Sequence, residues 1–330
     1  MTKTDILVIG AGWAGLTAAR SLQEAGRAVI VVDKARGPGG RSSTRRQAGF
    51  TFDHGAQYFT ARTEPFSRQV ERWRAAGLVA AWDAKIGVVG TAPRRVHNAG
   101  PGERLVGVPG MNAVLQSMGQ TLDCRFGWQV AELTWSEGWM ATTPDGDSIV
   151  ADHLVVAAPP QQSAALLGSG HPLFTQLQSV PMAPCWALML GYSVPLDAEV
   201  DALFINDGPL SWAACNGSKP GRAGHSWVVH ATPEWSQTNL EAEPESVAKN
   251  LLRAFRDVMP AATDAEPAFS QAHRWRFALS PEPLDDGLLY LGEQNLVIAG
   301  DWCAGNRIEG AWSSGRAAAK AMLAGHCSVS

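Results

Sequence analysis

The chain has 330 residues, of which 45% are hydrophobic and 18% charged, which is typical of a globular protein with one large core or two closely joined domains. Its 27 basic and 31 acidic residues give a net charge of −4, and the basic residues form only small clusters, so we expect no nucleic-acid partner. Five widely spaced cysteines lack a C-x-x-C pair, which argues against a disulfide framework and favours a reducing, cytoplasmic location.

An apolar N-terminal stretch, residues 6–19, is interrupted by three glycines and falls short of the ~20 residues that a membrane helix requires. The acid Asp5 precedes it in place of a basic cluster, and no small-residue cleavage site follows. We therefore expect neither a signal peptide nor a membrane anchor. The eight histidines show no H-E-x-x-H pair or other metal-ligand spacing, so we expect no metal.

The first 33 residues predict a nucleotide-binding half-fold. Residues 5–9 form a short apolar run, a glycine turn and an apolar helical pattern follow, and Gly26 ends the helix. Residues 28–32 form a second apolar run. A strand, helix, strand unit of this kind places its two strands parallel.

The remaining chain alternates helical and strand-like patterns. Helices are predicted at 65–81, 111–122, 245–258 and 310–323. Strands are predicted at 129–135, 139–143, 148–150, 154–158, 187–194, 227–231 and 296–299, with Pro159-Pro160 stopping the one before it. The segment from about 166 to 276 therefore predicts a sheet-based cap, after which the chain returns to its first half-fold.

Gly10-Ala11-Gly12-Trp13-Ala14-Gly15 lies where the first strand meets the first helix. Glycines there permit a tight turn and close approach to a pyrophosphate, although the pattern alone is weak in a chain with 34 glycines. Asp33 follows at the end of the second strand, where an acid binds a ribose hydroxyl and disfavours a 2′-phosphate. It could instead be a surface turn residue. The pair of motifs predicts FAD or NAD.

A second glycine-rich segment, Gly37-Pro38-Gly39-Gly40-Arg41, follows closely, with Lys34 between. A plain NAD enzyme needs no second phosphate contact here, whereas Arg41 would pair with a diphosphate in a bidentate manner. An ordinary flexible loop is the alternative. This segment favours FAD over NAD.

The third motif is Gly300-Asp301-Trp302-Cys303, which directly follows the C-terminal strand and precedes the last helix. A carboxylate there can accept hydrogen bonds from a ribityl hydroxyl, and the helix N-terminus can stabilise negative charge on a reduced flavin. Helix capping by Asp301 is the alternative.

These three motifs in this order resemble the glutathione-reductase-like flavoproteins, in the branch that contains the monoamine oxidases. Further motifs narrow the resemblance to the bacterial renalases over essentially the whole chain. They are Asp53 to Arg62, Gly107 to Met111, Asn216-x-Ser218-Lys219-Pro220, His230 to Ser236, Ala272 to Trp275 and Glu309 to Trp312.

The resemblance implies an α/β fold: a Rossmann-like FAD-binding domain with an inserted mixed α+β substrate (cap) domain, in a p-hydroxybenzoate hydroxylase-like topology. Expected boundaries are 1–64, 99–165 and 277–330 for the FAD-binding domain and 65–98 and 166–276 for the cap. The resemblance also implies noncovalently bound FAD and oxidation of the 2-dihydro and 6-dihydro isomers of NAD(P)H. Oxygen would be reduced to hydrogen peroxide, and no general base or obligate protein partner is expected.

The expected site has a cofactor-binding part and a substrate-lining part. We expect FAD to be bound by Gly10, Ala11, Gly12, Gly15, Asp33, Lys34, Gly40, Arg41, Gly55, Ala56, Val130, Asp301 and Ile308. We expect the substrate to be lined by Gln57, Tyr58, Phe59, Thr60, Ala61, His230, His273, Trp275 and Arg307. Arg307 could serve flavin or substrate, and a core role is the alternative for Phe59 and for each cap residue.

Two other functions stay open on these residues. A flavin amine oxidase uses the same scaffold, and Cys303 raises the option of a covalent flavin bond. A non-catalytic flavin-binding redox sensor is an alternative of a different class. A hydrolase is disfavoured, since the chain has no G-x-S-x-G elbow.

Overall fold

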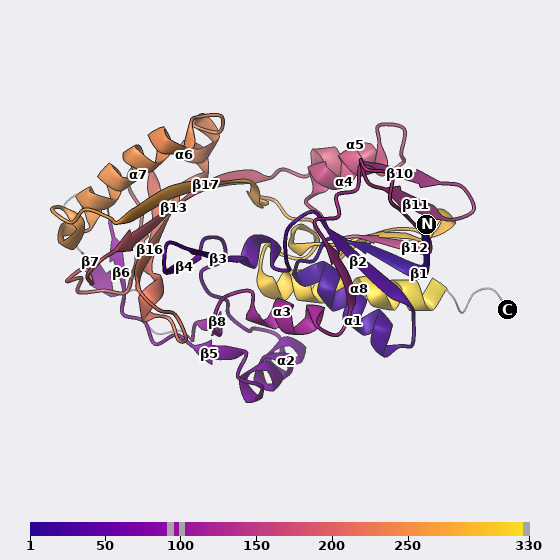
Figure 1. Cartoon of the computed structure of the whole chain (residues 1–330), viewed down its shortest axis with the longest axis horizontal. Helices are drawn as coiled ribbons and strands as arrows, with labels where there is room; N and C mark the ends of the chain where they lie inside the picture. The colour runs from indigo at the N-terminus through magenta and orange to yellow at the C-terminus, as the bar shows by residue number, and fades with distance from the viewer. Residues whose placement is uncertain (91–95, 99–102, 326–330) are drawn as a thin grey trace.

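The computed structural model of the chain describes residues 1–90, 96–98 and 103–325. It has two lobes, one built on an eight-stranded sheet and the other on a seven-stranded sheet (Figure 1). The first strand and the last described helix both belong to the first lobe. Among the described residues, no helix is both long and apolar enough to cross a bilayer.

The first sheet has a parallel centre with an antiparallel edge. Five strands run parallel: β1 (Thr2–Ile9), β2 (Val29–Asp33), β9 (Asp123–Phe126), β12 (Ser148–Val156) and β19 (Leu296–Ile298). The antiparallel members are β10 (Glu132–Trp135), β11 (Trp139–Thr142) and β18 (Leu289–Leu291). The predicted parallel pairing of the first two strands is confirmed, as is the Rossmann-like fold.

Helices cover both faces of this sheet, because its central strands are apolar on both sides. Helices α1 (Trp13–Glu24), α3 (Ala113–Gly119) and α8 (Ile308–Gly325) share one apolar core with Ile6 and Val8 of β1. Helices α4 (Pro160–Leu167) and α5 (Phe174–Ser179) pack on the opposite face, against Leu7 and Ile9.

The second sheet forms the cap, in the order β17–β13–β16–β15–β14–β6–β7. Its strands are β6 (Ile86–Val89), β7 (Val96–Asn98), β13 (Ala183–Tyr192), β14 (Ala202–Ile205), β15 (Leu210–Cys215), β16 (His225–Ala231) and β17 (Phe269–Leu279). Helix α7 (Pro244–Val258) packs on one face through Leu251 and Phe255, and α6 (Pro233–Thr238) lies beside β13. Residues of the other face, Trp212 among them, pack into the core of the first lobe.

Short elements connect the lobes. The hairpin of β3 (Thr44–Gln47) and β4 (Phe50–Asp53) lies between them (Figure 1). Strands β5 (Val79–Ala81) and β8 (Leu105–Gly107) pair, and α2 (Glu64–Ala75) precedes them. The 3-10 turns are η1 (Gly40–Ser42), η2 (Asn216–Ser218), η3 (Pro260–Ala262), η4 (Gly292–Gln294) and η5 (Asp301–Cys303).

Several predicted elements differ from the structure. The helix predicted at 65–81 ends at Ala75, because Gly77 adopts a φ of +71° and β5 follows. The strands predicted at 148–150 and 154–158 form the single strand β12. Pro160, expected to stop a strand, also begins α4, since proline is tolerated in a helix's first turn.

Two helices lie in segments that the predicted boundaries give to the cap. Phe66, Val70 and Trp73 of α2 are buried in the core that α1 and α8 share, and Leu177 of α5 is buried under the opposite face of the first sheet. Strand β6, by contrast, pairs with β14 inside the cap sheet. The described residues of the segment 65–98 are thus divided between the two lobes.

Candidate functional site

The carboxyl ends of four parallel strands meet at one edge of the first sheet. Gly10 follows β1, Asp33 ends β2, Ala157 follows β12, and Gly300 closely follows β19. Backbone bonds hold these ends together, with Gly10 N donating to Val32 O at 2.8 Å and Ala157 N to Ile9 O at 2.7 Å. Ligands of open α/β sheets bind at this edge, so all three glycine-containing motifs converge where a ligand is expected.

The first glycine turn leaves room for a ligand at Gly12. A Cβ on Gly15 would lie 1.9 Å from Gly10 O, so glycine is needed there for the helix to pack on the strand. A Cβ on Gly12 would meet nothing within 4 Å, and no side chain caps the α1 N-terminus that it precedes. Unpaired N–H groups facing open space are suited to a pyrophosphate.

Asp33 is fixed at the same edge. Its Oδ2 accepts a hydrogen bond from Ala11 N at 2.7 Å, and its Oδ1 accepts one from Ala35 N at 2.7 Å. Lys34 beside it is exposed. Trp128 N donates to Asp33 O at 3.0 Å, which brings the segment containing Val130 to this strand end.

The second glycine segment lies on the first. Gly39 N donates to Ala11 O at 3.1 Å, and Gly40, with a φ of +52°, would carry a Cβ only 3.5 Å from the Gly12 Cα. Arg41 then reaches the C-terminal motif: its Nη1 and Nη2 donate to Asp301 Oδ2 and Oδ1 at 3.0 and 2.5 Å. This bidentate ion pair joins motifs that are 260 residues apart in the sequence.

Gly55 and Ala56 adjoin Arg41. Ala56 N donates to Arg41 O at 2.9 Å, and a Cβ on Gly55 would lie 2.0 Å from the same oxygen. Ile308 begins α8, behind the exposed Arg307. The open space at Gly12, the fixed carboxylate of Asp33 and the Arg41–Asp301 pair together fit a dinucleotide that extends from β2 to α8.

Three predicted cap residues meet the loop after β4. His54 O accepts hydrogen bonds from Trp275 Nε1 at 2.9 Å and from His230 Nε2 at 3.3 Å. The His273 ring lies 4.8 Å from the His54 ring and 4.5 Å from that of Trp275, measured between centroids. The structure therefore brings His230, His273 and Trp275 together next to Gly55.

Burial keeps these histidines neutral. It lowers the pKa of His54 to about 3 and the pKa values of His230 and His273 to about 4 each. The nearby cations add to the effect, with Arg45 acting on His54 and His273 and Lys219 on His230. The site near neutral pH presents flat, uncharged rings.

The predicted lining segment 57–61 is divided between two environments. Gln57 is buried, its amide donates to Asp53 O and Gly55 O, and its Oε1 accepts from Lys219 Nζ at 3.2 Å. The Tyr58 ring lies 5.7 Å from that of Trp212 in the cap. Thr60 and Ala61 are half-buried.

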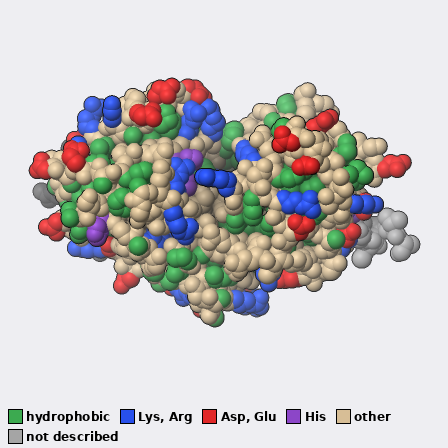
Figure 2. Space-filling view, in the orientation of Figure 1, with side chains coloured by type: hydrophobic (Ala, Val, Ile, Leu, Met, Phe, Trp, Pro, Cys, Tyr) green, Lys and Arg blue, Asp and Glu red, His purple; other side chains and the backbone are tan. Residues whose placement is uncertain are grey.

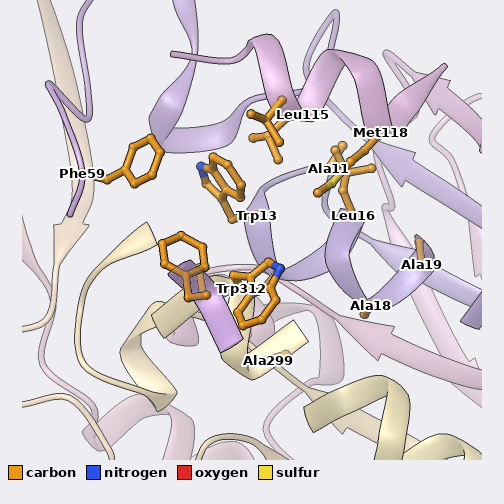
Figure 3. Close-up of a cluster of buried hydrophobic side chains, with 14 of the residues drawn as sticks. Ala11, Trp13, Leu16, Ala18, Ala19, Phe59, Leu115, Met118, Ala299 and Trp312 are labelled. Carbon is orange, nitrogen blue, oxygen red and sulfur yellow. The ribbon is translucent and has the colours of Figure 1, made fainter. Parts of the chain in front are cut away.

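Phe59 belongs to an aromatic core behind the glycine turn. It is 6% exposed, and its ring lies 6.4 Å from Trp13 and 6.0 Å from Phe66. Figure 3 shows Phe59 and Trp13 next to each other, with Trp312 of α8 below them. The core role that the sequence left open for Phe59 accounts for this position.

Sequence reasoning missed a buried charge cluster. The Asp53 side chain is fully buried, as are those of Lys219 and Arg222. Arg222 Nη2 donates to Asp53 Oδ2 at 2.6 Å, and Lys219 Nζ lies 3.4 Å from the same oxygen. Desolvation lowers the pKa of Lys219 to about 8. Asp53 and Lys219 lie within segments that carried the family resemblance, and opposite charges in two such segments were a signal for pairing.

A cationic rim borders the histidines. Arg45 Nη1 donates to Gln271 Oε1 at 3.0 Å, and its Nη2 lies 3.4 Å from His273 Nδ1. Burial and the charge of Arg36 lower the pKa of Arg45. Within the described part of the chain, neither Arg36 nor Arg45 forms an ion pair with a carboxylate. Figure 2 shows Lys and Arg side chains, with a histidine beside them, gathered where the two lobes meet.

Two surface cavities lie away from these residues. One, of about 480 Å³, is lined by residues that include Thr232 and Trp235. The other, of about 690 Å³, lies along α8 and includes Arg316. Neither includes a predicted site residue.

Comparison with known proteins agrees with this geometry. Residues 75–323 match the family described as flavin containing amine oxidoreductase, and residues 8–73 match the NAD(P)-binding Rossmann-like domain. A Mycobacterium tuberculosis protein named flavin-containing monoamine oxidase is 46% identical over 54 residues, which cover 16% of this chain and 12% of that protein.

Solved structures share the fold over nearly the whole chain. Cyclohexylamine oxidase from Brevibacterium oxydans superposes with a TM-score of 0.74 at 14% identity, covering 97% of this chain and 99% of that one. An Exiguobacterium protein titled as a protoporphyrinogen oxidase gives a TM-score of 0.76 at 12% identity, covering 98% and 99%. The chain belongs to the flavin-containing amine oxidoreductase family, whose cofactor is FAD.

Proposed function

We propose that this protein is an oxidase of misreduced nicotinamide dinucleotides, namely the 2-dihydro and 6-dihydro isomers of NAD(P)H. Noncovalently bound FAD supplies the hydride acceptor and returns the electrons to oxygen as hydrogen peroxide, while NAD(P)+ is released. The observation that carries the proposal is the neutral cluster of His54, His273 and Trp275 beside Gly55, with the Arg45 guanidinium next to it.

The flat neutral rings match the chemistry of a dihydropyridine. Loss of hydride makes that ring aromatic, so no proton has to leave it and no general base is required. The protein's task is to hold the ring in place. The rings of His273 and Trp275 provide flat surfaces on which the substrate ring can stack. The low pKa values of His54 and His273 keep both imidazoles uncharged near neutral pH.

Charge favours a dinucleotide over an amine. The Asp53 carboxylate lies beside two buried cations, Lys219 and Arg222. Among the described residues, Arg45 contacts the neutral side chains of Gln271 and His273. A protonated amine would enter a region of excess positive charge, whereas the pyrophosphate of NAD(P) would be attracted to it.

A flavin amine oxidase is the second candidate, since the chain belongs to that family. A covalent flavin bond through Cys303 is disfavoured, because its thiol is fully buried in an apolar cluster and burial raises its pKa. A non-catalytic redox sensor is a third candidate, and steady peroxide production would exclude it.

The proposal is tested by mixing the holoenzyme anaerobically with separated 2-dihydro and 6-dihydro isomers of NAD(P)H, normal NADH and simple amines. We expect rapid bleaching of the flavin band near ~450 nm by the misreduced isomers alone. Bleaching by amines alone would favour the second candidate. Yellow colour that stays with the protein after denaturation would refute noncovalent binding.

A further inference from the structure

One row of residues crosses the cap sheet toward the first lobe. The strand register pairs His273 with Ala187, Ala187 with His230, and His230 with Trp212. Directly paired residues of neighbouring strands project from the same face of a sheet. Trp212 therefore shares a face with the two histidines that meet the loop after β4. It lies on the strand next to that of His230, and strands β16 and β13 separate it from His273.

The indole of Trp212 is buried and incompletely bonded. It is 6% exposed, and its ring lies 4.7 Å from Phe204 and 5.7 Å from Tyr58, which belongs to the predicted lining segment. Its Nε1–H has no hydrogen-bond partner among the residues that the structure describes. A buried donor without an acceptor is costly and rare in folded proteins. The Trp212 N–H is therefore a candidate to donate a hydrogen bond to a bound ligand.

The indole N–H groups of two other tryptophans near the site donate hydrogen bonds within the protein. Trp82 Nε1 donates to Ser218 Oγ at 3.0 Å, and Trp275 Nε1 donates to His54 O at 2.9 Å. Trp82 lies in the same aromatic group, with its ring 6.5 Å from that of Trp212. The unpaired N–H is thus a property of Trp212 and not of the group around it.

We propose that Trp212 Nε1 donates a hydrogen bond to the carboxamide oxygen of the nicotinamide ring, which makes Trp212 a substrate-binding residue. The inference rests on the proposed function. An indole N–H can only donate, and the carboxamide oxygen is the strong acceptor that a dihydronicotinamide ring carries. Because indole does not titrate, the contact holds at every pH at which the protein is folded.

The experiment compares three oxidised dinucleotides bound to holoenzyme: NAD+, its 3-acetylpyridine analogue, which keeps the carbonyl, and its pyridine analogue, which lacks the substituent. Binding is followed by perturbation of the flavin spectrum. In Trp212→Phe we expect the first two to bind about tenfold more weakly and the third to bind as in the wild type.

Trp82→Phe is the matched control, since it makes the same chemical change to an indole whose N–H already has an acceptor. We expect it to leave the ratio of NAD+ to pyridine-analogue affinity at the wild-type value. A general packing defect in either variant would weaken all three ligands equally and leave that ratio unchanged.

The outcomes separate this inference from the function on which it rests. If wild-type enzyme oxidises the misreduced isomers and Trp212→Phe keeps the wild-type affinity ratio, the inference is wrong and the function stands. If the wild type leaves both isomers untouched, the proposed function fails, and the inference fails with it.

Discussion

His54 makes folding sensitive to acid. The residue is 4% exposed, and its burial, together with the charges of His273 and Arg45, lowers its pKa from 6.5 to about 3. Between pH 6.5 and pH 3, His54 is protonated in the unfolded chain but stays neutral in the folded chain. Stability from this group is therefore complete above pH 6.5 and declines as the pH falls toward 3.

At pH 5 we expect His54 alone to account for a loss of about 2 kcal/mol relative to neutral pH. His54→Phe, which cannot take up a proton, should show a flatter dependence of unfolding free energy on pH between 7 and 5. Urea denaturation at several pH values measures this. Parallel curves for the variant and the wild type would contradict the assigned pKa.

At the scale of an element, the N-terminus of α1 separates a folding role from a binding role. Gly12 has a φ of −88°, which alanine readily adopts, and its Cβ would meet no protein atom. Gly12→Ala should cost about 1 kcal/mol of stability or less. Its methyl group would fill the space that the pyrophosphate needs, so FAD should bind at least about tenfold more weakly.

Gly15→Ala is the contrasting variant on the same helix, because its Cβ would lie 1.9 Å from Gly10 O. We expect it to lose stability as well as FAD. Flavin titration into apoprotein and thermal unfolding distinguish the two effects. Wild-type FAD affinity in Gly12→Ala would show that the phosphates do not approach this turn.

At the scale of the whole molecule, the Asp53 cluster ties the lobes together. Asp53 ends β4 and accepts from Met111 N at 3.0 Å, while Lys219 and Arg222 belong to the cap. Asp53→Asn would leave two buried cations without their counter-charge. We expect a loss of about 3–5 kcal/mol in unfolding free energy, measured by urea denaturation.

The exposed pair Arg68–Glu64 provides the control, since its side chains are 67% and 74% exposed. Glu64→Gln should cost less than about 0.5 kcal/mol. Adding Lys219→Met to Asp53→Asn should recover part of the loss, because one buried cation is removed. An Asp53→Asn variant as stable as the wild type would mean that water reaches the cluster.

Features that depend on neighbouring residues could be predicted from the sequence. The glycine turn after β1 is formed by adjacent residues, and the place of Asp33 follows from the length of one strand, helix, strand unit. Pairings between distant segments could not. The Arg41–Asp301 ion pair spans 260 residues, and the alignment of His230 with Trp212 depends on a register that a bulge in β15 shifts.

Strand β9 shows the same limit. Its four residues, Asp123–Phe126, show no apolar run, and they are extended because they pair with β2. Phe59 was ambiguous for another reason: an aromatic residue in a half-buried segment fits a core as well as a binding surface, and the position of α2 decides between them.

The bidentate contact between Arg41 and Asp301 also orders events during synthesis. A ribosome translates residue 41 long before residue 301, so a nascent chain can form its first glycine turn before the partner of Arg41 exists. If this pair helps to hold FAD, as the sequence predicts, we expect tight flavin uptake only after β19 and α8 have been made.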